Sequence, residues 1–281
     1  MARQLERYQE IERSILTTYR KDIWSPFIVA IKRYNLIQAG DKIAVCISGG
    51  KDSMLLAKLL EQLQKISDVP FELVYMSMDP GYNEANRKKI EDNAKLLNIP
   101  IQFFNSDIFE VTARTEKNPC YLCARMRRGF LYNKAKELGC NKIALGHHKS
   151  DVIETTLMSI LYSGQIQGML PRIKSTNFEG MELIRPLYCI LERDIIRWVK
   201  ANKLEFIQCA CRLTEATSGQ EEHTVSSRLN TKRLIEKLSK EIPELEDHIF
   251  QSTHNVQLDT IVEYKTDGVR HSFLEKFDKN N

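Results

Sequence analysis

Residues 42–60 place an apolar strand pattern, a glycine turn and a helical pattern directly one after another. The strand pattern is KIAVCI (42–47), the turn is SGGKDS (48–53) and the helical pattern is MLLAKLL (54–60). Two adjacent glycines allow a tight turn and a close approach of the backbone to a ligand. The first N–H groups of the helix point toward that ligand, together with the positive end of the helix dipole. With a lysine and two hydroxyls added, the segment predicts a polyphosphate site.

The turn differs from two common nucleotide-binding loops. A Walker A loop has four residues between its first glycine and its Gly-Lys pair, whereas Gly49 and Gly50 are adjacent. The dinucleotide fingerprint of Rossmann folds also spaces its glycines differently. The segment resembles the SGGxDS pyrophosphate loop of ATP pyrophosphatases, which cleave ATP between the α- and β-phosphates and transfer AMP. An ordinary βα turn that contains Gly-Gly is the alternative.

The resemblance implies a role for each residue of the loop. The β- and γ-phosphates of ATP would be held by Ser48, Gly49, Gly50, Lys51 and Ser53. Asp52 has two interpretations, either a ligand of Mg²⁺ or an acidic side chain that the helix dipole stabilises. Mg²⁺ on the phosphate oxygens would offset the charge that develops on the leaving pyrophosphate.

The pattern after this loop alternates between strands and helices. Further strands are predicted at 71–76, 101–104, 142–145 and 182–184, with helices at 53–63, 86–97, 123–138 and 151–162. Such repetition is typical of an α/β fold with a parallel sheet and helices on both faces. Ligands of such sheets bind beyond the carboxyl ends of the strands. Because the glycine turn, Asp79 and the pair His147-His148 each follow a strand, we expect them to meet at that edge.

Helical patterns flank this alternation on both sides. Apolar residues recur at helical spacing within 1–39, and a second helical part follows a polar loop at 214–223. We therefore predict three parts: an N-terminal helical extension (1–39), an ATP pyrophosphatase domain (40–212) and a C-terminal helical region (213–281).

Four of the seven cysteines form two tight pairs. Cys120 and Cys123 make a C-x-x-C at the start of a basic helix, and Cys209 and Cys211 make a C-x-C after a strand. Thiolates are favoured at helix N-termini and near basic side chains. The pairs could form a Cys₄ zinc site, hold a [4Fe–4S] cluster on three thiolates or act as sulfur-handling catalytic thiols. The remaining three are predicted to be small core residues: Cys46, Cys140 and Cys189.

The charge balance permits a nucleic-acid partner without requiring one. The net charge is +4 and the pI is near 8.6. Two predicted helices have basic faces that suit RNA phosphates, and a solvated helix surface is the alternative. Their candidate RNA-binding residues are Arg125, Arg127, Arg128, Lys232 and Arg233.

The apolar pattern predicts no membrane-spanning segment, because no run of about 18 apolar residues is present. Residues 1–20 are rich in charge and lack the apolar centre of a signal peptide. We therefore expect a cytoplasmic protein, in which clustered cysteines serve metal or sulfur chemistry rather than disulfides.

Several segments together resemble the tRNA 2-thiocytidine synthetase (TtcA) family of ATP pyrophosphatases. Besides the glycine turn, they are PCYLCARMRRG (119–129), LGHHKSD (145–151), IRPL (184–187) and FIQC (206–209). All ATP pyrophosphatases share the first motif, whereas its combination with the cysteine block and the GHH sequence is much more specific. The resemblance spans most of residues 20–256. It implies the adenine-nucleotide α-hydrolase-like fold, with helical additions at both ends.

The resemblance implies ATP-dependent thiolation of tRNA. Members of the family bind ATP and Mg²⁺, adenylate O2 of the cytidine at tRNA position 32 and replace that oxygen by sulfur. They carry a [4Fe–4S] cluster on three cysteines, which here would be Cys120, Cys123 and Cys211, with Cys209 as the alternative third ligand. A cysteine desulfurase system would supply the sulfur, and the family also admits a homodimer.

The GHH segment has further implied roles. Gly146 would contact the nucleotide, and His147 or His148 would contact the α-phosphate or stabilise the adenylated base, the other being a core residue. Asp151 would either cap the following helix or bind metal. Asp79 would reach the nucleotide or form the turn with Pro80-Gly81.

The chain departs from the family pattern in three places. It has C-x-C where the family typically has C-x-x-C, Ser150 where aspartate is common, and an inserted polar loop at 216–224. These departures leave the modified base open. The alternatives are an amide-forming ligase, a thiolase that acts through a persulfide on one cysteine, and a nucleotide-dependent protein with a Cys₄ zinc site.

Overall fold

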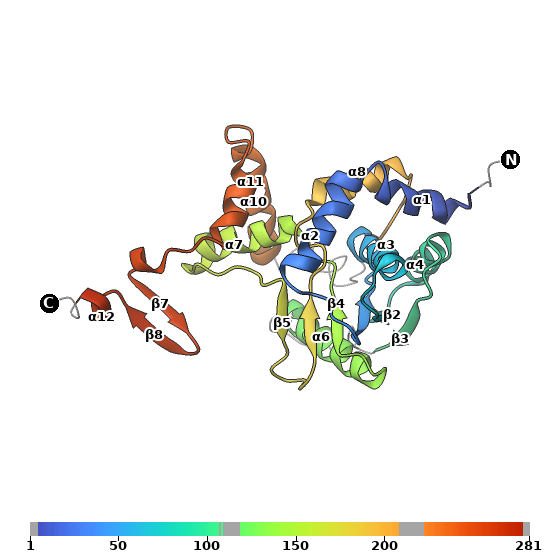
Figure 1. Ribbon diagram of the computed structural model, residues 1–281, viewed down its shortest axis with the longest axis horizontal. Helices are drawn as coiled ribbons and strands as arrows, with labels where there is room; N and C mark the ends of the chain where they lie inside the picture. Colours follow the sequence, from blue (N-terminus) through green and yellow to red (C-terminus); the bar gives the residue numbers. More distant parts are fainter. Residues whose placement is uncertain (1–4, 107, 109–118, 208–221, 278–281) are drawn as a thin grey trace.

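A six-stranded sheet forms the centre of the molecule (Figure 1). The computed structural model describes residues 5–106, 108, 119–207 and 222–277, and of residues 119–121, 124, 222–226 and 276 it describes the backbone alone. The strands are β1 (Lys42–Cys46), β2 (Glu72–Asp79), β3 (Gln102–Asn105), β4 (Lys142–Ala144), β5 (Arg172–Lys174) and β6 (Glu182–Ile184).

The strand order is β3-β2-β1-β4-β6-β5, and every neighbouring pair is parallel except β5 with β6. The predicted α/β fold with a mainly parallel sheet is therefore confirmed. The antiparallel edge strand β5 was not predicted, because three residues, Arg-Ile-Lys, are too few and too polar to show a strand pattern.

Both faces of the sheet are buried, and β1 shows how one strand serves two cores. Ile43 and Val45 belong to the larger core, whereas Ala44 and Cys46, which alternate with them, belong to a second core on the opposite face. A strand buried on both faces is continuously apolar, and this is why its sequence reads as an unbroken hydrophobic run.

Helices cover the two faces unequally. The larger core includes residues from α1 (Arg7–Leu16), the π-helix η1 (Arg20–Trp24), α2 (Ser25–Arg33), α3 (Lys51–Ile66), α4 (Glu84–Leu96) and α8 (Glu192–Ala201). The opposite face packs against α6 (Pro119–Glu137) through Tyr132 and Ala135. The N-terminal helices thus share one hydrophobic core with the sheet.

The C-terminal part packs on α7 (Lys149–Ser163) through α10 (Glu222–Leu238) and α11 (Leu245–Ser252). It then continues through the 3₁₀ helix η2 (Leu258–Thr260), β7 (Glu263–Thr266), β8 (Val269–Ser272) and α12 (Leu274–Phe277). The hairpin β7–β8, which lies apart from the sheet in Figure 1, was not predicted within this helical region. Its signal is present as Asp267-Gly268, because both residues have positive φ, as a two-residue hairpin turn requires.

The topology sets the place of a ligand site. From β1 the chain adds β2 and β3 on one side, and then β4 and β6 on the other. Ligands of such sheets bind at the carboxyl ends of the strands where the order reverses, which here is between β1 and β4. Within the described residues, no helix has both the length and the apolar content needed to cross a membrane.

Candidate active site

The loop 48–53 joins the carboxyl end of β1 to the first turn of α3, where the sequence analysis placed it. Gly49 has φ of +84°, and a Cβ atom there would lie 2.6 Å from Ile90 Cγ1 and 2.7 Å from Ile207 Cδ1. Gly50 follows as the N-cap of α3 with an extended backbone. Glycine is required at position 49 by both backbone conformation and space.

Ser53 holds the loop in shape from within. Its hydroxyl donates to the Gly50 carbonyl oxygen at 2.9 Å and accepts from the Ser48 backbone N and Ser48 Oγ, each at 3.2 Å. The side chains of the loop therefore fix its shape without a ligand. A phosphate site whose donors are already in place needs no rearrangement on binding.

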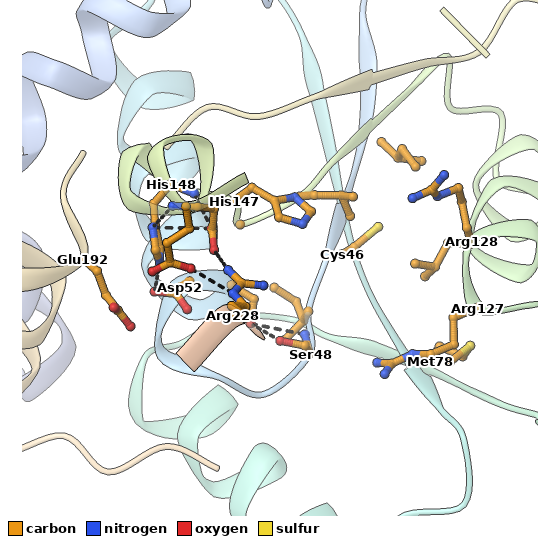
Figure 2. Close-up of a pocket in the computed structure, with 18 of the residues that line it drawn as sticks. Cys46, Ser48, Asp52, Met78, Arg127, Arg128, His147, His148, Glu192 and Arg228 are labelled. Carbon is orange, nitrogen blue, oxygen red and sulfur yellow. Dashed lines mark hydrogen bonds and ion pairs between the residues drawn. The ribbon is translucent and has the colours of Figure 1, made fainter. Parts of the chain in front are cut away.

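A cavity of about 910 Å³ lies at the reversal point of the strand order, within the size range of small-molecule and cofactor sites. Figure 2 shows Asp52, His148, Glu192 and Arg228 on one side of it and Arg127 and Arg128 on the other. The polar and charged residues in its lining, with one glycine, are Ser48, Asp52, Ser53, Arg127, Arg128, Gly146, His147, His148, Asp151, Glu154, Glu192, Arg228 and Lys232. The predicted meeting of the glycine turn with the histidine pair is confirmed.

His148 and Asp151 form a reciprocal cap at the start of α7. The Asp151 backbone N donates to His148 Nδ1 at 3.3 Å, and the His148 backbone N donates to Asp151 Oδ2 at 2.9 Å. Of the two interpretations of Asp151, the structure shows the capping role, with His148 as the N-cap and Asp151 at the third helical position. His148 Nε2 then lies 3.8 Å from Asp52 Oδ1.

Only one of the two carboxylate oxygens of Asp52 accepts a hydrogen bond from the part of the chain that the structure describes. Oδ2 accepts from Lys51 Nζ at 3.2 Å, whereas Oδ1 is buried and has no hydrogen-bond partner among the described residues. Burial raises the pKa of Asp52, although His148 and Lys51 oppose the shift. A buried carboxylate oxygen without a donor fits a hard cation, so this position suits a Mg²⁺ ligand.

Gly146 lies at the end of β4 against the start of α3. A Cβ atom there would lie 3.1 Å from the Asp52 carbonyl carbon and from Ser53 N. Gly146 therefore allows β4 and the pyrophosphate loop to approach closely, in addition to lining the cavity.

His147 is a neutral side chain of the cavity wall. Its Nδ1 is buried and lacks a hydrogen-bond partner within the described part of the chain. Burial lowers the pKa of His147 to about 4, with the positive charge of Arg185 acting in the same direction and Asp151 opposing it. At neutral pH the ring is therefore available for hydrogen bonding to a ligand, without a positive charge.

We predict a pH dependence of stability that originates in His147. Its folded-state pKa of about 4 lies below the ordinary value of 6.5, so the unfolded chain binds more protons between these pH values. The contribution of His147 to the free energy of unfolding should therefore grow as pH increases from 4 to 6.5. The same contribution should be lost as pH falls through that range. Urea denaturation of wild type and His147→Gln at several pH values in this interval tests the prediction. The free energy of unfolding should rise less steeply with pH in the variant than in the wild type. Equal slopes would contradict the assignment.

Glu192, at the start of α8, links the pyrophosphate loop to α10. Its Oε1 accepts from Lys51 Nζ at 2.9 Å, and its Oε2 accepts from Lys232 Nζ at 2.6 Å. Burial would raise the pKa of Glu192, but the two ammonium groups outweigh burial and lower it to about 2. Glu192 was not predicted as a site residue, because an acidic side chain in the first turn of a helix is ordinary.

Arg228 of α10 was also missed. Its Nε donates to Glu154 Oε2 at 2.8 Å, and its Nη2 donates to Asp151 Oδ1. A signal was available, because Arg228 and Lys232 are four residues apart and therefore share one face of the predicted helix.

The five predicted RNA-binding residues divide into two groups. Arg127, Arg128 and Lys232 line the cavity, whereas Arg125 and Arg233 are exposed and are not part of its lining. Helices α6 and α10 therefore each place basic side chains in the cavity lining and on the exposed surface.

Asp79 does not line the cavity. Its Oδ1 accepts from the backbone N of Gly81 at 2.9 Å and of Tyr82 at 2.8 Å, while its Oδ2 accepts from Arg87 Nη1 at 2.7 Å. Burial opposes ionisation, but these donors outweigh it and lower the pKa of Asp79. Of its two interpretations, the structure supports the turn.

Cys123 lies near the cavity wall. It is buried together with Met78 and Ile108, and Met78 lines the cavity. The backbone of Cys120 lies in the first turn of α6, and Cys209 and Cys211 lie outside the described residues. The described residues contain no group of three histidine, cysteine or acidic side chains arranged for a metal ion.

The other three cysteines are core residues, as predicted. Cys46 and Cys140 are buried, and Cys189 packs against the larger core. Burial raises the pKa of Cys46 to about 12, with Cys140 adding to the shift. Although Cys46 lines the cavity, it is therefore a protonated and unreactive thiol.

The chain matches the PP-loop domain family over residues 8–212. It is 35% identical over 231 residues to the tRNA-cytidine(32) 2-sulfurtransferase of Syntrophotalea carbinolica, a match that covers 81% of this chain and 86% of that protein. The chain belongs to the tRNA-cytidine(32) 2-sulfurtransferase family. The enzyme of the same name from Anaeromyxobacter dehalogenans is also 35% identical, over 230 residues, which are 81% of this chain and 76% of the relative.

A solved structure shares the fold of this family member. It is the U34-tRNA thiolase NcsA of Methanococcus maripaludis with its [4Fe–4S] cluster, with a TM-score of 0.62 and 20% sequence identity. The match covers 92% of this chain and 81% of the thiolase. The likeness supports the adenine-nucleotide α-hydrolase-like fold expected from the sequence.

Proposed function

We propose that this protein is an ATP-dependent tRNA sulfurtransferase that converts the cytidine at position 32 to 2-thiocytidine. One observation carries the proposal: a single cavity contains the SGGKDS loop, the histidine pair and the basic residues of α6, with Cys123 buried beside its wall. The family membership points to the same reaction. It would act in the cytoplasm.

The first step is adenylation of the base. The loop residues Ser48, Gly49, Gly50, Lys51 and Ser53 hold the β- and γ-phosphates. Asp52 would hold Mg²⁺ through Oδ1, and the ion would offset the charge on the leaving pyrophosphate. O2 of the cytidine attacks the α-phosphorus, the bond from that phosphorus to the bridging oxygen breaks, and pyrophosphate leaves. Neutral His147 hydrogen-bonds the adenylated base, whose former carbonyl oxygen is now part of a good leaving group.

The second step is replacement of that oxygen. A hydrosulfide nucleophile attacks C2, the C2–O bond breaks, and AMP leaves with the former O2 of the cytidine. The proton of the hydrosulfide passes to the released phosphates or to water. The overall reaction consumes cytidine, ATP and hydrosulfide and forms 2-thiocytidine, AMP and pyrophosphate.

Cys120, Cys123 and Cys211, with Cys209 as the alternative to Cys211, would hold a [4Fe–4S] cluster. When bound, the cluster would supply an iron site that delivers sulfide. Two observations fit this arrangement: Cys123 lies in apolar surroundings that restrict solvent access, and the chain leads to Cys209 from Ile207, which packs beside Gly49. A cysteine desulfurase system would provide the sulfur, and two copies of the chain would form a homodimer, as the family implies.

The tRNA would bind across the exposed basic residues around the cavity. Arg125 and Arg233 are exposed and suit contacts with phosphates. An enzyme cannot reach a base that is stacked between its neighbours, so the target cytidine would be flipped out of the stack into the cavity.

The test uses the full chain purified without oxygen, together with ATP, Mg²⁺, sulfide and tRNA transcripts that carry C32 or U32. We expect AMP and 2-thiocytidine, measured by mass spectrometry of digested tRNA, with the C32 transcript alone. Thiolation of another base would overturn the choice of substrate. AMP formation that depends on ammonia instead of tRNA would overturn the reaction class and support a ligase.

A further inference from the structure

Helix α10 lies outside the matched family domain and yet forms part of the nucleotide cavity. The domain match ends at residue 212, whereas α10 spans Glu222–Leu238. Arg228, Leu229 and Lys232 of this helix line the same cavity as the pyrophosphate loop. A side chain supplied from beyond the domain can therefore act on whatever the loop binds.

Lys232 and the loop residue Lys51 bind the same carboxylate, that of Glu192, which holds Lys232 beside the loop. Glu192 accepts from Lys232 Nζ through one oxygen and from Lys51 Nζ through the other, at 2.6 and 2.9 Å. Both ammonium groups are thereby brought to one place. An ammonium group has three N–H donors, so a lysine that gives one to Glu192 can still donate to phosphate oxygens.

We infer that Lys232 is a ligand of the β- and γ-phosphates of ATP and that Glu192 positions it, so that the C-terminal helix completes the pyrophosphate site. The inference rests on the proposed function for the identity of the nucleotide. A polyphosphate carries several negative charges, and Lys232 places a second ammonium group near Lys51. The carboxylate of Glu192 between them offsets one of the two positive charges.

The geometry distinguishes this role from an RNA contact. Lys232 is half-buried in the cavity wall, whereas the next residue, Arg233, is exposed. Successive residues on a helix point about 100° apart, so α10 can present one cation to ATP and its neighbour to tRNA.

The test is calorimetric binding of ATP, inorganic pyrophosphate and AMP to the full chain without tRNA. Lys232→Met should weaken ATP and pyrophosphate about tenfold, the effect of losing one charge-assisted hydrogen bond. AMP affinity should change less than about twofold, because AMP lacks the phosphates that Lys232 contacts. Lys240→Met, the same substitution at an exposed lysine just beyond α10, should leave all three affinities unchanged. Lys232→Arg, which keeps the charge, should recover most of the ATP affinity.

Two results would overturn the inference. One is unchanged ATP and pyrophosphate affinity in Lys232→Met. A separate measurement in which this variant binds tRNA as weakly as Arg233→Ala does would then make Lys232 an RNA contact. The other is an equal loss for AMP and ATP, which would indicate general damage to the cavity. Failure of the proposed function would look different, because the wild type itself would then bind no ATP or form no 2-thiocytidine.

Discussion

Replacing Cys123 by alanine is expected to abolish thiolation, with a loss of about 100-fold or more, because an iron centre would lose a ligand. ATP affinity should stay within about twofold of wild type, since Cys123 does not itself line the cavity. Mass spectrometry of the modified nucleoside measures the first effect, and calorimetry measures the second. Iron and acid-labile sulfide content should fall together with the activity.

Cys140 provides the matched control for this substitution. It is as buried as Cys123, and burial raises the pKa of its thiol, but it packs in the second core and does not line the cavity. Cys140→Ala should therefore keep its iron and its thiolation. Retention of both by Cys123→Ala would refute a ligand role for Cys123. Stoichiometric zinc without labile sulfide would favour the zinc alternative.

Gly49→Ala is expected to lose ATP binding and to lower the free energy of unfolding by roughly 2–4 kcal/mol. Two causes act together at this position. The backbone has φ of +84°, which an alanine adopts only with strain, and the new Cβ would lie 2.6 Å from Ile90 Cγ1 and 2.7 Å from Ile207 Cδ1. Relief of those contacts requires the Ile90 and Ile207 side chains or the loop to shift. The backbone strain falls on the loop itself, so we expect the phosphate-binding shape to be lost.

Gly180→Ala separates the two causes. Gly180 has a similar φ of +76°, but a Cβ there would meet no atom within 4 Å. The free energy of unfolding of this variant should fall only by the amount that backbone strain costs, about 1 kcal/mol, and the variant should bind ATP normally. Urea denaturation of both variants gives the comparison. Equal losses of stability would show that space around Gly49 is not limiting.

Local signals in the sequence were sufficient for the parallel strands of the sheet and for the pyrophosphate loop, but not for the antiparallel edge strand β5. The loop was readable because strand, glycines and helix start are contiguous, so each depends on neighbours along the chain. The pair Asp267-Gly268 shows that a local signal can also be overlooked, since the hairpin around it was not predicted. Asp79 shows that a correct local signal can still mislead about the site. It follows a strand as predicted, but its carboxylate accepts from Arg87 and from two backbone N–H groups of a turn and does not line the cavity.

The sequence by itself determined the fold class, the phosphate loop and the family, because these follow from contiguous patterns. Only the tertiary structure decided which charges meet in the cavity. Glu192 is 141 residues from Lys51 and 40 residues from Lys232 in the chain, yet it bonds both. Arg228 is 77 residues from Asp151. Electrostatic interactions depend on distance in space. The packing of α7, α8 and α10 sets the distances between these charged side chains, and no periodicity along the chain encodes them.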